Sequence, residues 1–157
     1  MLLNHYTACL ENHVQGKLAT CLNENGASFT FANLEGQAKE ALLPMLIHQT
    51  AEIIFGSDNT VETGESYRLK NLITLGINVA LTKNAVDNTD GSRSSIVVAN
   101  ITNVSSAPIT IGEIGARRLT NFGNTNTYVI FDRTPLGTPL VIQPGEVGRI
   151  VYTITMS

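Results

Sequence analysis

The stretch LITLGINVALTK, residues 72–83, alternates apolar side chains with small or polar ones over its whole length. Side chains of a β-strand point alternately to its two faces, so this stretch predicts a strand with one buried face. Residues 95–104 alternate in the same way, after a polar connection at 84–94 that contains Asp90-Gly91. We therefore predict that the two strands pair as a hairpin. The predicted buried face carries Ile73, Leu75, Ile77, Val79 and Leu81 in the first strand and Val97, Ala99 and Ile101 in the second.

The chain beyond residue 104 also predicts short strands separated by turns. Pro144-Gly145 suits the last turn, because proline presets one backbone angle and glycine supplies the freedom that the next position needs. The Asn- and Thr-rich residues 120–127 predict an exposed loop. Such a pattern favours an antiparallel β-sandwich, Ig-like or jelly-roll-like, over a parallel sheet, which requires helical crossovers. The predicted strands are 109–116, 127–132, 140–143 and 147–156.

The first third of the chain has a different pattern. Apolar residues recur every three or four positions in 4–23, which predicts an amphipathic helix that Asn25-Gly26 ends. A short extended segment at 28–33 and a second helical stretch at 34–55, interrupted by Pro44, follow. The predicted fold class is therefore α+β, with a helical segment at 1–56 and the sandwich at 57–157.

Composition bounds the classes of function. The chain has 157 residues, 43% of them hydrophobic and 15% charged, and a formal net charge of -3. This length suits one core, and the slight negative charge disfavours direct binding to nucleic acid or to an anionic membrane surface. The sequence shows neither a secretory signal nor a membrane-spanning stretch, so we expect synthesis in the cytoplasm.

The sequence contains only weak candidates for a catalytic or metal-binding site. His5, His13 and His48 all lie in the predicted helical part, away from most serines, and no nucleophile elbow is present. Cys9 and Cys21 are expected to be buried thiols, and with His13 they lack the spacing of a zinc site. We therefore expect no enzyme activity, no metal site and no cofactor.

Acidic loops and acceptor patterns are equally unspecific. Asp87, Asp90 and Gly91 lack the ligand spacing and closing glutamate of a calcium loop. A second acidic loop carries Asp58, Glu62 and Glu65. Two glycosylation patterns begin at Asn100 and Asn103, and they carry no weight without a secretory signal.

Positive charge in the second half gathers at a few arginines. Arg117-Arg118 is the one adjacent basic pair, and Arg133 and Arg149 add to it. We expect these side chains to lie at strand edges, where charge discourages aggregation.

The C-terminal third also carries an ordered set of motifs: ITIGEIGARRL at 109–119 and YVIFDRTPLGTPLVIQPGEVGRIVYTITM at 128–156. This pattern resembles small structural proteins of tailed bacteriophages, which contain an "EIG" strand, an "RT-x-L" turn, a "P-x-x-I" strand, a P-G turn and a closing "YTI" strand. The chain departs from that pattern after Gly115, where Ala116 and two arginines replace an apolar or aromatic pair. The residues that carry the resemblance are Ile111, Glu113, Ile114, Gly115, Asp132, Arg133, Thr134, Leu136, Pro139, Ile142, Pro144, Gly145, Tyr152, Thr153 and Ile154.

The resemblance implies a virion building block without catalytic activity. Under this interpretation the chain is a capsid decoration or cement protein, whose predicted N-terminal helices contact neighbouring subunits. Its partners would be the major capsid protein or other virion proteins, together with further copies of itself. A neck, tail, baseplate or fibre-anchoring component is the alternative, and a carbohydrate-binding module for host attachment is a third possibility.

Two local predictions concern turns. Asp132 and Arg133, before a Thr134-Pro135 turn, are expected to form a local charge-assisted hydrogen-bond set that fixes the corner. Gly145 is expected to be essential to the last hairpin.

Overall fold

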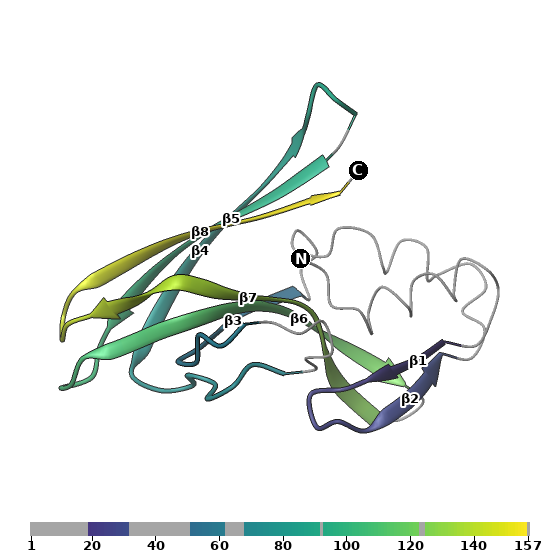
Figure 1. Ribbon diagram of the computed structural model, residues 1–157, viewed down its shortest axis with the longest axis horizontal. Coiled ribbons are helices and arrows are strands. Elements are labelled where there is room, and N and C mark those ends of the chain that lie inside the picture. The colour runs from purple at the N-terminus through teal and green to yellow at the C-terminus, as the bar shows by residue number, and fades with distance from the viewer. Residues whose placement is uncertain (1–18, 32–50, 62–67, 92, 123–124, 157) are drawn as a thin grey trace.

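The computed structural model describes residues 19–31, 51–61, 68–91, 93–122 and 125–156 (Figure 1). These residues form strands joined by turns and loops, and no helix occurs among them. The strands are β1 (Ala19–Leu22), β2 (Ser28–Phe31), β3 (Ala51–Gly56), β4 (Ile77–Asp87), β5 (Arg93–Asn103), β6 (Ile109–Phe122), β7 (Thr125–Ile142) and β8 (Val147–Met156).

All strand pairs are antiparallel and make three sheets. β1 and β2 form a small hairpin, and the two larger sheets have the strand orders β3-β6-β7 and β4-β5-β8. The small hairpin lies beside the far ends of β6 and β7, and the tip of the β4–β5 hairpin projects beyond the body of the molecule (Figure 1). The paired strands β4–β5 and β6–β7 follow one another in the chain, whereas β3 reaches β6 and β5 reaches β8 across long connections.

One hydrophobic core joins the two larger sheets. Ile114 of β6 and Ile130 of β7 face Val97 and Ile101 of β5 in a single cluster, and all four are at most 1% exposed. Alternation explains the arrangement, because every second residue of these strands points inward. Apolar burial of this kind is the main stabilising contribution to a two-layer β-structure.

The predicted α+β class is wrong for the described residues. Residues 19–22, expected to end a helix, form β1 and pair with β2, and residues 51–55, expected to end a second helix, form most of β3. Ile53, Ile54 and Phe55 are all buried, and such a short apolar run is ambiguous between a helix and a strand covered on both sides. The rest of the two predicted helices, 4–18 and 34–50, lies outside the described residues.

The predicted 95–104 and 147–156 strands and the pairing of the first of them with the preceding strand are confirmed, whereas the predicted last hairpin is wrong, because β7 and β8 belong to different sheets. β5 pairs with β4 across a turn at 88–91, and β7 and β8 are joined through Gly145, whose φ is 79°. The 72–83 prediction is displaced, because Gly76 adopts a φ of 78° and β4 begins only after it. Leu75, expected on the buried face, is 84% exposed.

Two expected interruptions are strand instead. β6 and β7 pair up to Phe122 and Thr125, so most of the predicted 120–127 loop belongs to the hairpin. The predicted turn at Thr134-Pro135 is also wrong, because β7 continues through it. The register shifts there, with Ile111 pairing with Leu140 and Glu113 with Pro135, so that residues 136–139 bulge opposite Gly112.

Candidate functional site

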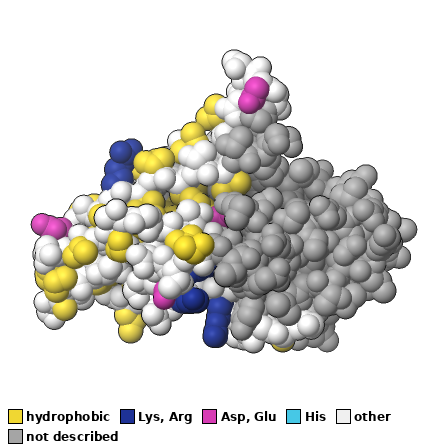
Figure 2. All heavy atoms as spheres, viewed as in Figure 1, with side chains coloured by type: hydrophobic (Ala, Val, Ile, Leu, Met, Phe, Trp, Pro, Cys, Tyr) yellow, Lys and Arg dark blue, Asp and Glu magenta, His cyan; other side chains and the backbone are white. Residues whose placement is uncertain are grey.

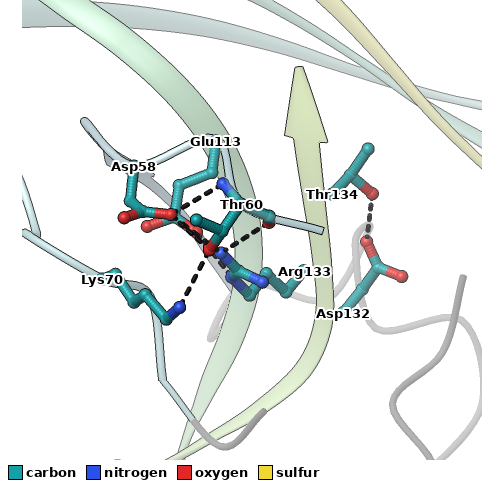
Figure 3. A network of polar contacts seen from close by, with 7 residues as sticks. All are labelled: Asp58, Thr60, Lys70, Glu113, Asp132, Arg133 and Thr134. Carbon is teal, nitrogen blue, oxygen red and sulfur yellow. Dashed lines mark hydrogen bonds and ion pairs between the residues drawn. The ribbon is translucent and has the colours of Figure 1, made fainter. Parts of the chain in front are cut away.

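The motif residues meet at a buried ion pair. Glu113 and Arg133 lie on neighbouring strands and on the same sheet face, and Arg133 Nε donates to Glu113 Oε2 at 2.5 Å. Their side chains are 0% and 1% exposed. Figure 3 shows the two groups directed toward each other, with Asp58, Thr60 and Lys70 around them. Removing one partner of a buried pair of this kind strongly destabilises the folded protein.

A loop segment covers this pair. We call residues 57–61 and 68–72 the strap. Arg133 Nη2 donates to the Thr60 carbonyl oxygen at 3.3 Å and lies 3.8 Å from Asp58 Oδ1. Lys70 Nζ donates to Thr60 Oγ1 at 2.8 Å. The guanidinium of Arg133 therefore joins the sheet to the strap.

The "EIG" motif has a simple geometric explanation. Ile114 points into the core, whereas Glu113 points to the opposite face, under the strap. Gly115 faces Leu69, and a Cβ built at position 115 would lie only 2.3 Å from Leu69 Cδ1. The three residues thus supply a core contact, a buried anion and the space for a strap residue.

Burial and neighbouring groups alter the ionisation of this cluster. Burial raises the pKa of Glu113 above its usual value, and the hydrogen bond and charge of Arg133 oppose that shift. The pKa of half-buried Asp58 is lowered, first by the hydroxyl and backbone N–H of Thr60, which donate to its carboxylate.

Asp132 lies on the core side of the same strand. Tyr152 Oη of β8 donates a short hydrogen bond to Asp132 Oδ2, and Thr134 Oγ1 donates to the same oxygen at 3.0 Å. Asp132 and Arg133 point to opposite sides of β7 (Figure 3). The predicted local set between these neighbours is therefore wrong. Each one instead reaches a different layer, Asp132 the opposite sheet and Arg133 the strap.

Arg117 ties the small hairpin to the larger sheet. Its guanidinium contacts the carboxylates of Glu24 and Glu52 at 2.9–3.0 Å and lies 4.0 Å from the ring centroid of Tyr128. The backbone N–H of Glu24 also donates to the Tyr128 carbonyl oxygen. Tyr128 Oη donates to Glu52, and this bond raises the pKa of Tyr128. Sequence reasoning placed Arg117 at a charged edge, whereas it is an internal clamp.

Asn103 organises the end of the molecule near the last turn. Its amide nitrogen donates to the carbonyl oxygens of Ala107 and Ile142, both at 2.8 Å, and its amide oxygen accepts from the N–H and hydroxyl of Ser105. The Asn103 side chain is fully buried, so the residue that begins the second glycosylation pattern is packed inside the folded protein. Asn100, in the neighbouring pattern, is exposed.

A hollow of about 560 Å³ lies beside the strap. It opens between the β1–β2 turn, at Glu24 and Asn25, and the strap residues 68–72, with Asp58 at its margin. Asn71, in its wall, has a φ of 52°, and its carbonyl oxygen accepts from the Ser57 N–H. The hollow is thus bordered by the elements that Arg133 and Arg117 hold in place.

The remaining sequence candidates lie apart from the polar network. Asp87 ends β4 and Asp90 lies in the projecting β4–β5 turn, and Arg149 is exposed on β8. Asp58 belongs to the network, but Glu62 and Glu65 lie outside the described residues, as do Cys9 and all three histidines. The side chains of Cys21 and Arg118 are likewise outside the description. Within the described ranges, no three His, Cys, Asp or Glu side chains gather as a metal site would require.

Comparison with known proteins finds no matching family, no matching curated protein and no matching solved structure. In the part of the chain that the structure describes, no helix is long and apolar enough to cross a membrane.

Proposed function

We propose that this chain is a non-enzymatic structural protein of a tailed-bacteriophage particle and that it decorates and reinforces the capsid. The observation that carries the proposal is the place of the residues behind the resemblance. Glu113 and Arg133 are buried under the strap, and Asp132 and Tyr152 join the two sheets. The residues that carry the resemblance therefore make contacts that hold the layers together, which supports the role of a building block.

The surface supports a docking role. Paired residues of neighbouring strands share a face, so Thr82, Val98 and Val151 form one row on the outer face of the β4-β5-β8 sheet. Thr102 and Val147 lie on the same face, and exposed Asn100 and Arg149 lie between these two rows. We call these seven side chains the outer face. Hydrophobic side chains are scattered among uncharged ones over the described half of the view in Figure 2, and charged groups are few.

Such a face suits attachment to a large protein surface. Val147 and Val151 are 61% and 54% exposed, and covering them would contribute roughly 25 cal/mol per Å² of apolar area before the costs of association. Many weak contacts repeated over a symmetric shell can reinforce it collectively. We propose that the outer face lies against the capsid, with the major capsid protein as its partner.

The structure changes the roles expected of the N-terminal and C-terminal parts of the chain. Residues 1–55 were expected to supply helical contacts to neighbouring subunits, yet residues 51–55 belong to β3, which pairs with β6 in the larger sheet. Deleting 1–55 would remove a strand and damage the fold itself. A test of attachment therefore needs substitutions on exposed side chains.

The experiment compares two valine substitutions on opposite sheets. Val151→Asp places a charge on the outer face, and Val141→Asp is the matched control on β7, where the valine is 51% exposed. Purified protein is added to particles that lack it, and the bound amount is measured after sedimentation. We expect wild type and Val141→Asp to bind, and Val151→Asp to lose at least about tenfold in affinity.

Either of two results would overturn the proposal. Wild-type protein that does not bind such particles would contradict attachment altogether. Equal binding by Val151→Asp and wild type, with both folded by circular dichroism, would exclude the outer face as the contact.

A further inference from the structure

We propose that β4 is the interface between two copies of this chain, which pair antiparallel along their β4 edges about a two-fold axis near Thr82. β4 is the first strand in the order β4-β5-β8, so one of its edges has no neighbouring strand among the described residues. The unpaired backbone N–H and C=O groups on such an edge can form a ladder of hydrogen bonds with another extended strand. This inference concerns the chain alone and does not depend on capsid attachment.

The inward-facing apolar side chains of β4 are more exposed than those of β5 and β8. In one row across the sheet, Ile150 of β8 and Ala99 of β5 are 8% and 0% exposed, whereas Leu81 of β4 is 39% exposed. The next row repeats the trend, from fully buried Ile101 to Val79, which is also 39% exposed. The inward-facing apolar surface therefore continues past the layer that covers it, and a further strand at β4 would flank this row with its own inward-facing side chains and reduce its exposure.

The composition of β4 leaves its edge open to pairing. Natural edge strands are protected by proline, bulges or charged side chains, and an inward-pointing lysine is one such device, so Lys83 is the single protection of this kind within β4. β4 runs for 11 residues without proline, and its pairing with β5 is regular from Ile77 to Asp87. Lys83 is the one charged residue between the ends of the strand.

Lys83 itself is directed toward the opposite sheet. The side chain is half-buried, and this burial lowers its pKa while the charge of Glu52 on β3 opposes the shift. Its stem thus adds to the inward-facing layer.

A second copy fits this edge better than a partner of different sequence. Full overlap of two antiparallel β4 strands centres the axis on Thr82, so paired residues lie at equal distances on either side of it. Leu81 of one copy then lies opposite Lys83 of the other, and Val79 lies opposite Ala85. No two like charges face each other, and each copy flanks the exposed apolar row of its mate.

The pairing would also join two outer faces. Because a twofold axis at the edge continues one sheet into the other, the dimer would present a six-stranded surface in place of a three-stranded one.

Charge substitution at Leu81 tests the register. Leu81→Lys would place a second ammonium opposite Lys83 of the other copy, whereas Leu81→Glu would place a carboxylate there. Val141→Lys, on β7, is the control for adding a charge at an exposed valine. The full chain and each variant are measured by analytical ultracentrifugation over a range of concentrations, with folding checked by circular dichroism.

We expect a reversible monomer–dimer equilibrium that Leu81→Lys weakens at least about tenfold, while Leu81→Glu and Val141→Lys leave the dimer intact. Hydrogen exchange should show that β4 amides become protected as concentration rises. A chain that stays monomeric at every concentration would overturn the proposal. Equal weakening by the lysine and glutamate variants would overturn it as well, because in this register only the lysine faces a like charge. Since the measurement uses no capsid, failure of capsid binding would not affect its result.

Discussion

Replacing Arg133 by methionine should expose how the motif stabilises the fold. The substitution keeps most of the side-chain stem but leaves the fully buried Glu113 without its guanidinium partner, and it removes the bond to Thr60 of the strap. Loss of one partner from a buried pair costs about 3–5 kcal/mol. For a chain of this size, that corresponds to a fall in Tm of about 6–20 °C.

The effect should depend on pH with a defined sign. The pKa of Glu113 is raised in the folded protein, so the folded state holds this proton more tightly than the unfolded state. Stability from this group is therefore greatest at low pH and is lost as pH rises through the folded pKa. In Arg133→Met the pKa rises further, so the loss of stability should be largest near about pH 8 and shrink toward about pH 5.

Urea unfolding at several pH values, followed by circular dichroism, measures both effects. The double variant Glu113→Met/Arg133→Met is the control, because replacing both partners by apolar side chains should recover most of the lost stability. An Arg133→Met variant within about 1 kcal/mol of wild type would refute the reasoning. A double variant as unstable as the single one would also refute it.

Three further substitutions test other contacts. Gly145→Val forces a branched side chain into a φ of 79° and should cost about 1–2 kcal/mol in urea unfolding, whereas Gly137→Val, at an open exposed position, should change stability by under about 0.5 kcal/mol. Asn103→Ala removes four hydrogen bonds and should cost about 2–3 kcal/mol, while exposed Asn100→Ala should be nearly neutral; equal effects would contradict the role of Asn103. Arg117→Met should free the β1–β2 hairpin, so that hydrogen exchange in residues 19–31 becomes faster than in wild type by a larger factor than exchange in β5. Exchange in residues 19–31 that equals wild type would show that the clamp is dispensable.

Local signals explain which parts of the fold the sequence could predict. The hairpin of β4 and β5 and the closing Pro144-Gly145 turn depend on alternation and on turn residues close together in the chain. β3 was missed because its pattern is a short apolar run. Its strand character comes from pairing with β6, which lies about sixty residues further along, and no local pattern reports such a partner.

The polar network shows the same limit. Glu113, Asp132 and Arg133 stood out in the sequence as parts of the resemblance, yet adjacency suggested that the last two would contact each other. In a strand, neighbouring side chains point to opposite faces, so register decides their partners. The continuation of β7 through Thr134 separates them, and only the register with β6 brings Arg133 to Glu113.

Copy number in purified particles tests the central claim most directly. On the proposal that this chain is a virion protein, quantitative mass spectrometry of purified phage particles would give its ratio to the most abundant shell subunit. Capsid decoration predicts a ratio near one or a simple large fraction of it, because decoration repeats with the symmetry of the shell. A trace ratio would contradict decoration and favour a neck, tail or fibre position, and complete absence from the particles would contradict a structural role in the virion.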